Sequence, residues 1–175
     1  MPDIATPAEG PLKGLRVLEL CQLIAGPFCG QLFADMGAEV IKVEAPGQGD
    51  PMRGWGRKGY PLLWPVIARG KKAITANLRV PEGQDIVRAL VKQADFLIEN
   101  FRPGVMDRLG LTYSRLARLK PGLIMTSISN FGQTGPYRDY KATEIVEYAI
   151  GGPMLFTGTS GREPVKLGAN VGLYL

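Results

Sequence analysis

The sequence contains no histidine and only two cysteines among its 175 residues. Without an imidazole, this chain cannot use histidine as a general base, which excludes Ser-His and Cys-His hydrolysis within it. Cys21 and Cys29 do not form a CxxC pair and have no histidine beside them. We therefore expect neither a disulfide framework nor a metal site.

Long apolar runs are also missing from the sequence. No stretch has the length of a membrane span or the pattern of a secretory signal, so we expect a cytoplasmic protein with no membrane partner. Residues 1–10 are small and proline-containing, which predicts a disordered leader before a domain over residues 11–175. The chain stops on the apolar segment Val171–Leu175, and we expect a truncated piece of a longer protein.

The common nucleotide-binding and hydrolase motifs are absent as well. Residues 21–27, which follow the first expected strand, contain no GxGxxG, so NAD binding is disfavoured. No GxxxxGKS/T phosphate loop and no GxSxG occur either. The remaining candidates are single polar residues at strand ends, where ligands of open α/β sheets bind.

Lysine and arginine outnumber aspartate and glutamate by 21 to 16, which gives a formal net charge of +5. The excess is scattered, without a basic tail or a basic-aromatic alternation, so a nucleic-acid partner is only weakly indicated. A small phosphorylated ligand accounts for the surplus equally well. With 45% hydrophobic and 21% charged residues, the composition is typical of a globular domain.

Segments of strand length alternate with segments of helical period, which predicts an α/β fold with a largely parallel sheet and flanking helices. The expected strands cover residues 15–20, 39–44, 72–78, 95–99 and 122–130. The expected helices run from Gly26-Pro27 to a C-cap at Gly37, and then over residues 81–93, 105–109, 113–119 and 142–150. Thr112 is placed to cap the helix over 113–119.

The segment from Pro46 to Gly70 holds six glycines and four prolines, which predicts a long surface loop without regular structure. It carries both tryptophans, Trp55 and Trp64. Loops of this length in compact domains are usually functional or mobile.

Two groups of polar residues stand near expected element ends. Asn100, Phe101 and Arg102 follow the strand over 95–99, at the carboxyl edge of the sheet. Lys141 and Glu144 flank the start of the last helix. Each has an ordinary alternative role, because asparagine forms turns, arginine is commonly a solvated surface charge, and glutamate in a first helical turn favours the helix dipole.

Several long segments, in their order and spacing, look like one protein family. They are PLKGLRVLEL, AGPFCGQLFADMGAEVIKVEAPGQGDPMR, GKKAITANL, ADFLIENFRPGVMDRLGL, LKPGLIMTSISNFGQTGPY and KATEIVEYAIGG, which together cover nearly all of residues 11–175. The sequence resembles the amino-terminal part of class III coenzyme A transferases, the CaiB/BaiF family that includes formyl-CoA transferases. The resemblance implies a Rossmann-like large domain completed by a carboxyl-terminal segment, and an interlocked dimer.

Members of this family move CoA from an acyl-CoA to an acceptor carboxylic acid, so coenzyme A is expected as a substrate rather than as a bound cofactor. The CoA-binding positions of the family match Asn77, Leu78, Arg79, Asn100, Phe101, Arg102, Arg108 and Lys141. Arginine and lysine can bind the phosphates of CoA through charge-assisted hydrogen bonds, and asparagine can fix its adenosine or pantetheine part. The resemblance places Glu144 on a glutamate near the active site of formyl-CoA transferases.

The sequence also departs from the family. Active transferases have an aspartate nucleophile after a glycine, which attacks the acyl-CoA carbonyl and forms a mixed anhydride. Here the glycine matches Gly172, and the next residue is Leu173. Formyl-CoA transferases have glutamine at the position of Ile24 and arginine at that of Ala45, and the racemase branch needs a histidine base that this chain lacks.

Three functional hypotheses follow. The first is an acyl-CoA:carboxylate CoA transferase that acts as a homodimer or hetero-oligomer. The second is a catalytically silent CoA-binding or structural subunit, which Leu173 favours. The third is that Glu144 replaces the missing nucleophile, although a helix-start glutamate also has the ordinary role given above.

Overall fold

The computed structural model describes residues 9–56 and 61–168. The chain divides into two compact units, Met1–Ile128 and Ser129–Leu175. Residues 1–8 of the expected leader lie outside the described residues. Gly10 is described, and it lies against the backbone of Met36, because a β-carbon placed on it would stand 2.2 Å from the Met36 carbonyl oxygen.

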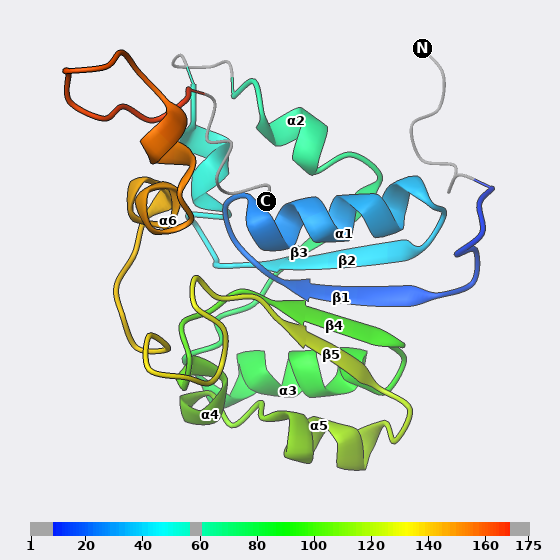
Figure 1. The fold of residues 1–175 in the computed structure, drawn as a ribbon. Helices are drawn as coiled ribbons and strands as arrows, with labels where there is room; N and C mark the ends of the chain where they lie inside the picture. The colour runs from blue at the N-terminus through cyan, green and yellow to red at the C-terminus, as the bar shows by residue number, and fades with distance from the viewer. Residues whose placement is uncertain (1–8, 57–60, 169–175) are drawn as a thin grey trace. The chain divides into compact units, whose positions relative to one another are not determined.

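The first unit is built on a parallel five-stranded sheet in the order β3-β2-β1-β4-β5 (Figure 1). The strands are β1 (Arg16–Leu20), β2 (Glu39–Glu44), β3 (Lys71–Thr75), β4 (Phe96–Glu99) and β5 (Ile124–Ser127). Successive strands first add on one side of β1 and then on the other, which is the order of a Rossmann-like doubly wound sheet. The expected α/β fold with a largely parallel sheet is therefore confirmed.

Helices cover both faces of this sheet (Figure 1). One face carries α1 (Ala25–Asp35), and the other carries α3 (Pro81–Val91) and α5 (Tyr113–Leu119). The shorter elements are η1 (Pro51–Gly54), α2 (Trp64–Ile67) and α4 (Val105–Arg108). The strand order reverses between β1 and β4, so the crevice of the fold lies at the carboxyl ends of these two strands.

The two faces of the sheet bury different kinds of side chain. Alternate strand residues point to opposite faces, so Leu18 packs toward α3 while Val17 packs toward α1. The α3 face carries the larger apolar core cluster. The α1 face carries a smaller apolar cluster and also buries the charged residues Glu19 and Lys42.

Several expected boundaries were wrong for identifiable reasons. The segment 46–70 is not without regular structure, because Pro51 and Pro65 stand in the first turns of η1 and α2, where a missing backbone N–H is tolerated. β3 ends at Thr75 instead of residue 78, because Asn77 turns the chain by accepting a hydrogen bond from the Arg79 N–H. β5 is likewise shorter than expected and ends at Ser127.

Two local expectations are confirmed, the cap of α5 and the glycine after α1. Thr112 caps α5, and its hydroxyl accepts a hydrogen bond from the Arg115 N–H. Gly37 follows the end of α1 with φ of 95°, the left-handed conformation that glycine adopts without strain. Both cysteines are free thiols, with Cys21 buried and Cys29 half-buried.

The second unit contains α6 (Glu144–Ile150) and η2 (Pro153–Phe156), preceded by a loop. Asn130 ties this loop together by donating a hydrogen bond to the Ala142 carbonyl. Phe131, Tyr137 and Tyr140 form a cluster of tilted and edge-to-face ring contacts in it. α6 starts at Glu144, two residues later than expected.

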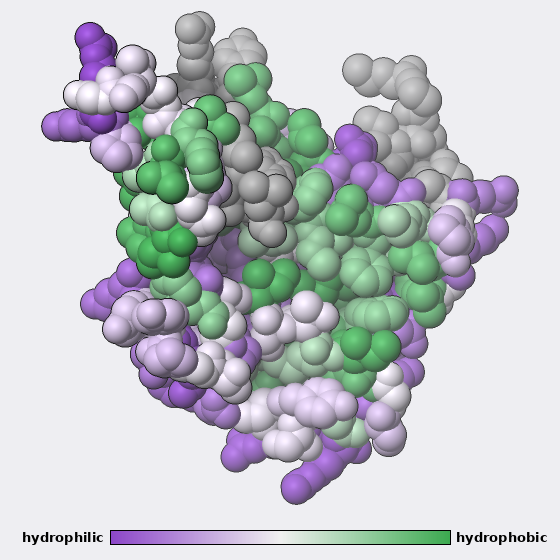
Figure 2. Space-filling model, viewed as in Figure 1, coloured by the Kyte–Doolittle hydropathy of each residue, from purple (hydrophilic) through white to green (hydrophobic). Residues whose placement is uncertain are grey.

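Apolar side chains also reach the surface of the first unit. Figure 2 shows them in green on the side that faces the viewer, where α1 and the edge strand β5 lie. They include Leu32 and Met36 of α1 and Ile124 of β5. No helix in the described ranges is both long and apolar enough to cross a bilayer.

Gly83 provides a test of the close contact between α3 and the loop after β3. A β-carbon at Gly83 would stand 2.0 Å from the carbonyl oxygen of Asn77, so the helix and the loop could not both keep their places. We expect Gly83→Ala to lower the free energy of unfolding by about 2 kcal/mol. This loss would occur despite the roughly 1 kcal/mol by which alanine usually favours a helix over glycine.

The matched control is Gly122→Ala, where an added β-carbon meets no atom within 4 Å. Its unfolding free energy should stay within about 0.5 kcal/mol of the wild type. Urea unfolding of the three proteins measures both effects. Equal stability of the two variants would refute the close contact.

Candidate functional site

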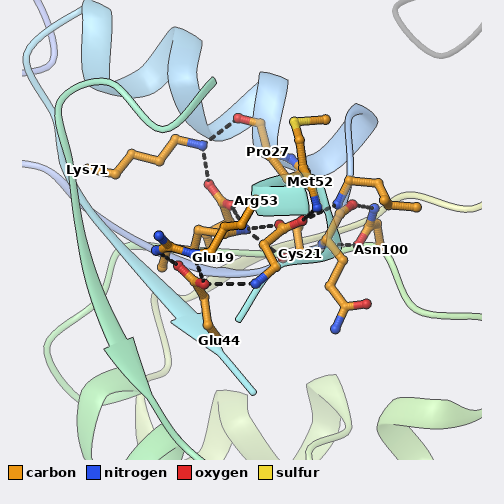
Figure 3. A network of polar contacts seen from close by, with 12 residues as sticks. Glu19, Cys21, Pro27, Glu44, Met52, Arg53, Lys71 and Asn100 are labelled. Carbon is orange, nitrogen blue, oxygen red and sulfur yellow. Dashed lines mark hydrogen bonds and ion pairs between the residues drawn. The ribbon is translucent and has the colours of Figure 1, made fainter. Parts of the chain in front are cut away.

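A network of charged side chains is buried beneath the carboxyl edge of the sheet on its α1 face (Figure 3). Glu19 of β1 lies at its centre, with one carboxylate oxygen 2.8 Å from the Lys42 Nζ and the other 2.7 Å from the Lys71 Nζ. Lys42 also pairs with Asp50 at 2.8 Å. The parallel register brings Glu19 and Lys42 side by side, since these residues are directly paired between β1 and β2.

A second pair continues the network toward the surface. Arg53 of η1 forms two hydrogen bonds of 2.8 Å with the two carboxylate oxygens of Glu44, at the end of β2. Its guanidinium also stacks on the ring of Trp64, 4.0 Å from the ring centroid. The Asp50 N–H donates to Glu44, which joins the two parts of the network. Three carboxylates therefore meet three cations, and the buried charge is balanced.

Burial and pairing shift the pKa values of these groups in different directions. Burial alone would lower the pKa of Lys42, but Glu19 and Asp50 more than offset it, and the net shift is upward. For Lys71 burial dominates, and its pKa is lowered although Glu19 partly compensates. Burial would raise the pKa of Glu44, but the bonds from Arg53 and the Asp50 N–H lower it below its usual value. The ordinary charged forms of Lys42 and Glu44 are thus favoured by their partners.

The network holds the turn that joins β1 to α1. Lys42 donates a hydrogen bond to the Cys21 carbonyl, and Asp50 accepts one from the Leu23 N–H. From the other side, Asn100 accepts from the Gln22 N–H at 2.9 Å and donates to the Gln22 carbonyl at 2.8 Å. Leu23 has a φ of 65°, the only positive value of any non-glycine residue in the described ranges. This conformation costs an L-residue about 1–2 kcal/mol, so the side-chain contacts must maintain it.

A cleft of about 600 Å³ opens beside the network, at the carboxyl ends of β2 and β3. Its lining residues are Glu44, Ala45, Gly47, Gln48, Gly49, Arg53, Ala73, Ile74 and Thr75. The volume falls within the range of small-molecule sites. Ala45, one of the positions at which the sequence departs from formyl-CoA transferases, therefore lies in the wall of this cleft.

The expected residues Asn77, Leu78 and Arg79 follow β3 at the same edge of the sheet. Asn77 uses its side-chain oxygen within its own turn, and Leu78 packs against the apolar core. Arg79 is exposed. Of this group, Arg79 has the side chain that is free to reach a ligand.

The expected residues Asn100, Phe101 and Arg102 follow β4, and Arg108 ends the short helix α4 that comes next. Asn100 bonds the Gln22 backbone, and the Phe101 N–H donates to Glu99, whose pKa is raised by burial. Arg102 and Arg108 are exposed.

The Arg108 guanidinium lies next to the loop that carries Arg102. A β-carbon placed on Gly104 would stand 3.6 Å from the Arg108 Nη1. Within the described residues, neither of these arginines nor Arg79 forms an ion pair. All three therefore remain available to an anionic ligand.

Lys141 and Glu144 belong to the second unit. Lys141 is exposed, and Glu144 is buried with an ion pair of 2.9 Å to the Lys166 Nζ. A carboxylate that is buried and paired in this way is poorly accessible as a nucleophile. Gly172 and Leu173, the expected glycine and nucleophile positions, lie outside the described residues.

Sequence reasoning missed the buried network. Glu19, Lys42 and Glu44 were assigned only to strands, and Asp50 and Arg53 only to a loop. A usable signal existed, because LRVLEL places Glu19, and EVIKVE places Lys42, directly between apolar residues of a strand. Charged residues are almost never fully buried unless they are paired, so opposite charges in two adjacent strands predict a buried ion pair.

Comparison with known proteins links the chain to one family. The family model described as CoA-transferase family III matches residues 12–175. Succinyl-CoA--D-citramalate CoA-transferase of Chloroflexus aurantiacus is 55% identical over 165 residues, which cover 93% of this chain and 41% of that protein. Succinate--glutarate CoA-transferase of Agrobacterium fabrum is 44% identical over 170 residues, which cover 92% and 42%. The chain thus spans less than half the length of these relatives.

Solved structures give the same result. A CAIB/BAIF family protein from Brucella suis superposes with a TM-score of 0.87 and 40% identity, over 95% of this chain and 46% of that one. A protein from Mycobacterium tuberculosis superposes with a TM-score of 0.86 and 35% identity, over 95% and 46%.

Lys42→Met tests whether the network stabilises the fold. The substitution keeps a long apolar stem but leaves Glu19 and Asp50 without their shared buried cation. We expect the free energy of unfolding to fall by about 3–5 kcal/mol, the usual cost of removing one partner of a buried ion pair. Lys72→Met is the control, because Lys72 is an exposed lysine that pairs with Glu39, and it should change stability by less than about 0.5 kcal/mol. Similar urea midpoints for the two variants would contradict a stabilising network.

Glu44→Gln tests the depressed pKa of Glu44. A carboxyl whose folded pKa lies below its unfolded value contributes stability above the unfolded pKa and loses it as pH falls through the folded pKa. We expect Glu44→Gln to be less stable than the wild type at pH 7, with a difference that shrinks below about pH 4, near the unfolded glutamate value. Urea unfolding between pH 7 and pH 3 measures this difference. A gap that stays constant over that range would show that the charge of Glu44 is not involved.

Proposed function

The chain belongs to CoA-transferase family III, and from this premise we propose that it forms part of an acyl-CoA:carboxylate CoA transferase. The single observation that carries the proposal is the arrangement of its free cations at the carboxyl edge of the parallel sheet. Arg79 stands after β3, and Arg102 and Arg108 stand after β4, on either side of the crevice at β1.

The spacing of these cations favours a long ligand. β3 and β4 are separated by β2 and β1, so three interstrand spacings, or roughly 14 Å, lie between them. A small carboxylate cannot reach both groups, whereas an extended thioester carrier with phosphates at one end can. Arginine binds phosphate well, because its planar group offers paired donors.

The cleft beside Ala45 supports a place for one end of this ligand. It lies at the end of β3, on the same strand that leads to Arg79, and its lining is mixed in polarity. In this proposal the cleft takes one end of the ligand, and the other end lies toward the β1–β4 crevice. Asn77 to Arg79, Asn100 to Arg102, Arg108 and Lys141 are the proposed CoA-binding positions, and they stay predictions.

Relatives suggest which acids to test. The proteins from Chloroflexus aurantiacus and Agrobacterium fabrum are named for succinyl-CoA with D-citramalate and for succinate with glutarate. We propose succinyl-CoA as donor and a dicarboxylic acid as acceptor. In the reaction, an enzyme carboxylate would attack the thioester carbonyl, release the CoA thiolate and hold the acyl group as a mixed anhydride.

Other parts of the proposal concern assembly and location. We propose a homodimer or a hetero-oligomer. Relatives include the alpha and beta subunits of a succinyl-CoA--L-malate CoA-transferase from Chloroflexus aurantiacus, which supports the hetero-oligomer. We also propose a cytoplasmic location. Since the nucleophile position Leu173 has no carboxylate, a silent CoA-binding subunit is the alternative that the experiments must separate.

Calorimetric titration of the intact protein with CoA tests the binding proposal. Arg108→Ala should weaken binding by about tenfold or more, because a hydrogen bond to a charged group contributes about 1.5–3 kcal/mol. Lys141→Ala should act in the same direction. Arg118→Ala is the control, since α5 runs back to the amino edge of the sheet and its last turn lies away from the site. Absence of CoA binding by the wild type would refute the proposal.

Hydroxylamine trapping after incubation with succinyl-CoA, read by mass spectrometry of the protein, tests the catalytic step. Attack on the enzyme carbonyl of the mixed anhydride would release succinate and leave a hydroxamate on the enzyme carboxylate, and this protein-bound adduct would support the transferase. CoA binding without an adduct would favour the silent subunit. An adduct that disappears in Glu144→Gln would identify Glu144 as the replacement nucleophile.

A further inference from the structure

The turn at Cys21–Leu23 occupies a special place in the first unit. It leaves the carboxyl end of β1 where the strand order reverses toward β4. In open parallel sheets this is the position at which ligands bind. The shape of this turn therefore decides what the crevice can accept.

Side chains from three different segments fix the backbone of this turn (Figure 3). Lys42 comes from β2, Asp50 from the segment after β2, and Asn100 from the end of β4. Together they bond four backbone groups in three consecutive residues. The backbone groups of ordinary turns form hydrogen bonds within the turn or with solvent. Four hydrogen bonds from side chains of other segments therefore indicate that one conformation of this turn is required.

Leu23 shows what these hydrogen bonds maintain. A leucine in the left-handed region leaves it when nothing opposes the change, because its β-carbon is crowded there. Asn100 holds the residue before Leu23, and Asp50 holds the Leu23 N–H itself. Gly26 adds a steric limit, since a β-carbon there would stand 2.4 Å from the Cys21 Sγ and 3.2 Å from the Asn100 Cγ.

Among the three side chains that hold the turn, Asn100 comes from the β4 side of the crevice, opposite Lys42 and Asp50. Its oxygen and its nitrogen both bond Gln22, so the plane of its amide is set by the backbone of the turn. An amide fixed in this way is poorly placed to turn toward a ligand. Asparagine is required here because one side chain must accept from an N–H and donate to a carbonyl at once.

We propose that Asn100 is a positioning residue, which holds the Gln22–Leu23 turn in its strained conformation so that the turn, and not the Asn100 side chain, contacts the acyl-CoA. This inference rests on the proposed function and changes it at one position, because Asn100 then belongs to the CoA site through the turn that it holds and not through a side-chain contact with CoA. Asn100 acts through Leu23, because loss of its two hydrogen bonds lets Leu23 relax away from the left-handed region.

The test is a rescue by glycine. Asn100→Ala should lower kcat/KM for CoA transfer by roughly tenfold, since small displacements of contacting groups cost up to about a hundredfold. Glycine adopts the left-handed conformation without strain, so in a Leu23→Gly background the turn keeps its shape with less support. In the Leu23→Gly background, Asn100→Ala should lower kcat/KM only about twofold. Such non-additivity is expected of residues that act through one another.

The matched control is Asn77→Ala, an asparagine that bonds only within its own turn after β3. Its loss of kcat/KM should be the same in the wild-type and Leu23→Gly backgrounds. Equal losses for Asn100→Ala in the two backgrounds would mean direct contact with CoA, and would overturn the positioning role.

Amide hydrogen exchange provides a readout that needs no substrate. Asn100→Ala should accelerate exchange at the Gln22 N–H, which loses its acceptor, and at the neighbouring Leu23 N–H. Unchanged exchange at both amides would overturn the proposal whatever the kinetics show. A wild-type protein that neither binds nor transfers CoA refutes the proposed function, whereas an active one without glycine rescue refutes only this inference.

Discussion

The pairing of three buried carboxylates with three cations is the constraint on which the first unit depends. Glu19 is buried on the α1 face of the sheet, where both Lys42 and Lys71 pair with it, and Lys42 also pairs with Asp50. A buried charge without its partner costs several kcal/mol, so each member fixes the position of the next. The register of β1 with β2 and the path of the segment after β2 are thereby tied to one another.

The ion network is connected to the candidate site by hydrogen bonds from its side chains to the backbone of the β1–α1 turn. Lys42 and Asp50 are ion-pair partners, and each also bonds the turn after β1. Asp50 also holds η1, because its side chain accepts a hydrogen bond from the Met52 N–H. Glu44 holds Arg53 in the wall of the adjoining cleft through two hydrogen bonds. The walls of the crevice and the cleft are consequently parts of one connected polar structure beneath the carboxyl edge.

The sequence predicted the elements well where local signals agreed with the fold. β2 was predicted with its correct bounds, because Gly37 and Ala45-Pro46 mark both sides of a short run that contains three β-branched residues. β3 was predicted too long, because KAITANL continues an apolar pattern while the Asn77 side chain turns the backbone. Segment 46–70 was misjudged because proline starts single helical turns as readily as it forbids longer ones.

The candidate site could be predicted only in part. Residues at the ends of β3 and β4 follow from the rule for parallel sheets, and the structure places them there. The ion network depends on which residues of neighbouring strands lie opposite one another, and a single strand does not carry that information. The pairing of Asn100 with Gln22 joins residues 78 positions apart and is visible only in three dimensions.

The exposed arginines and the side chains that fix the β1–α1 turn have different roles in the proposed site. Arg79, Arg102 and Arg108 are exposed cations that can grip a ligand, but long flexible side chains do not define a precise acyl site. Precision requires groups whose positions are set before the ligand arrives. In this unit such groups are backbone atoms of the β1–α1 turn, because side chains on both sides of the crevice hold them. In the proposed site, affinity and geometry are thus assigned to separate sets of residues, and the strained leucine marks the place where geometry is imposed.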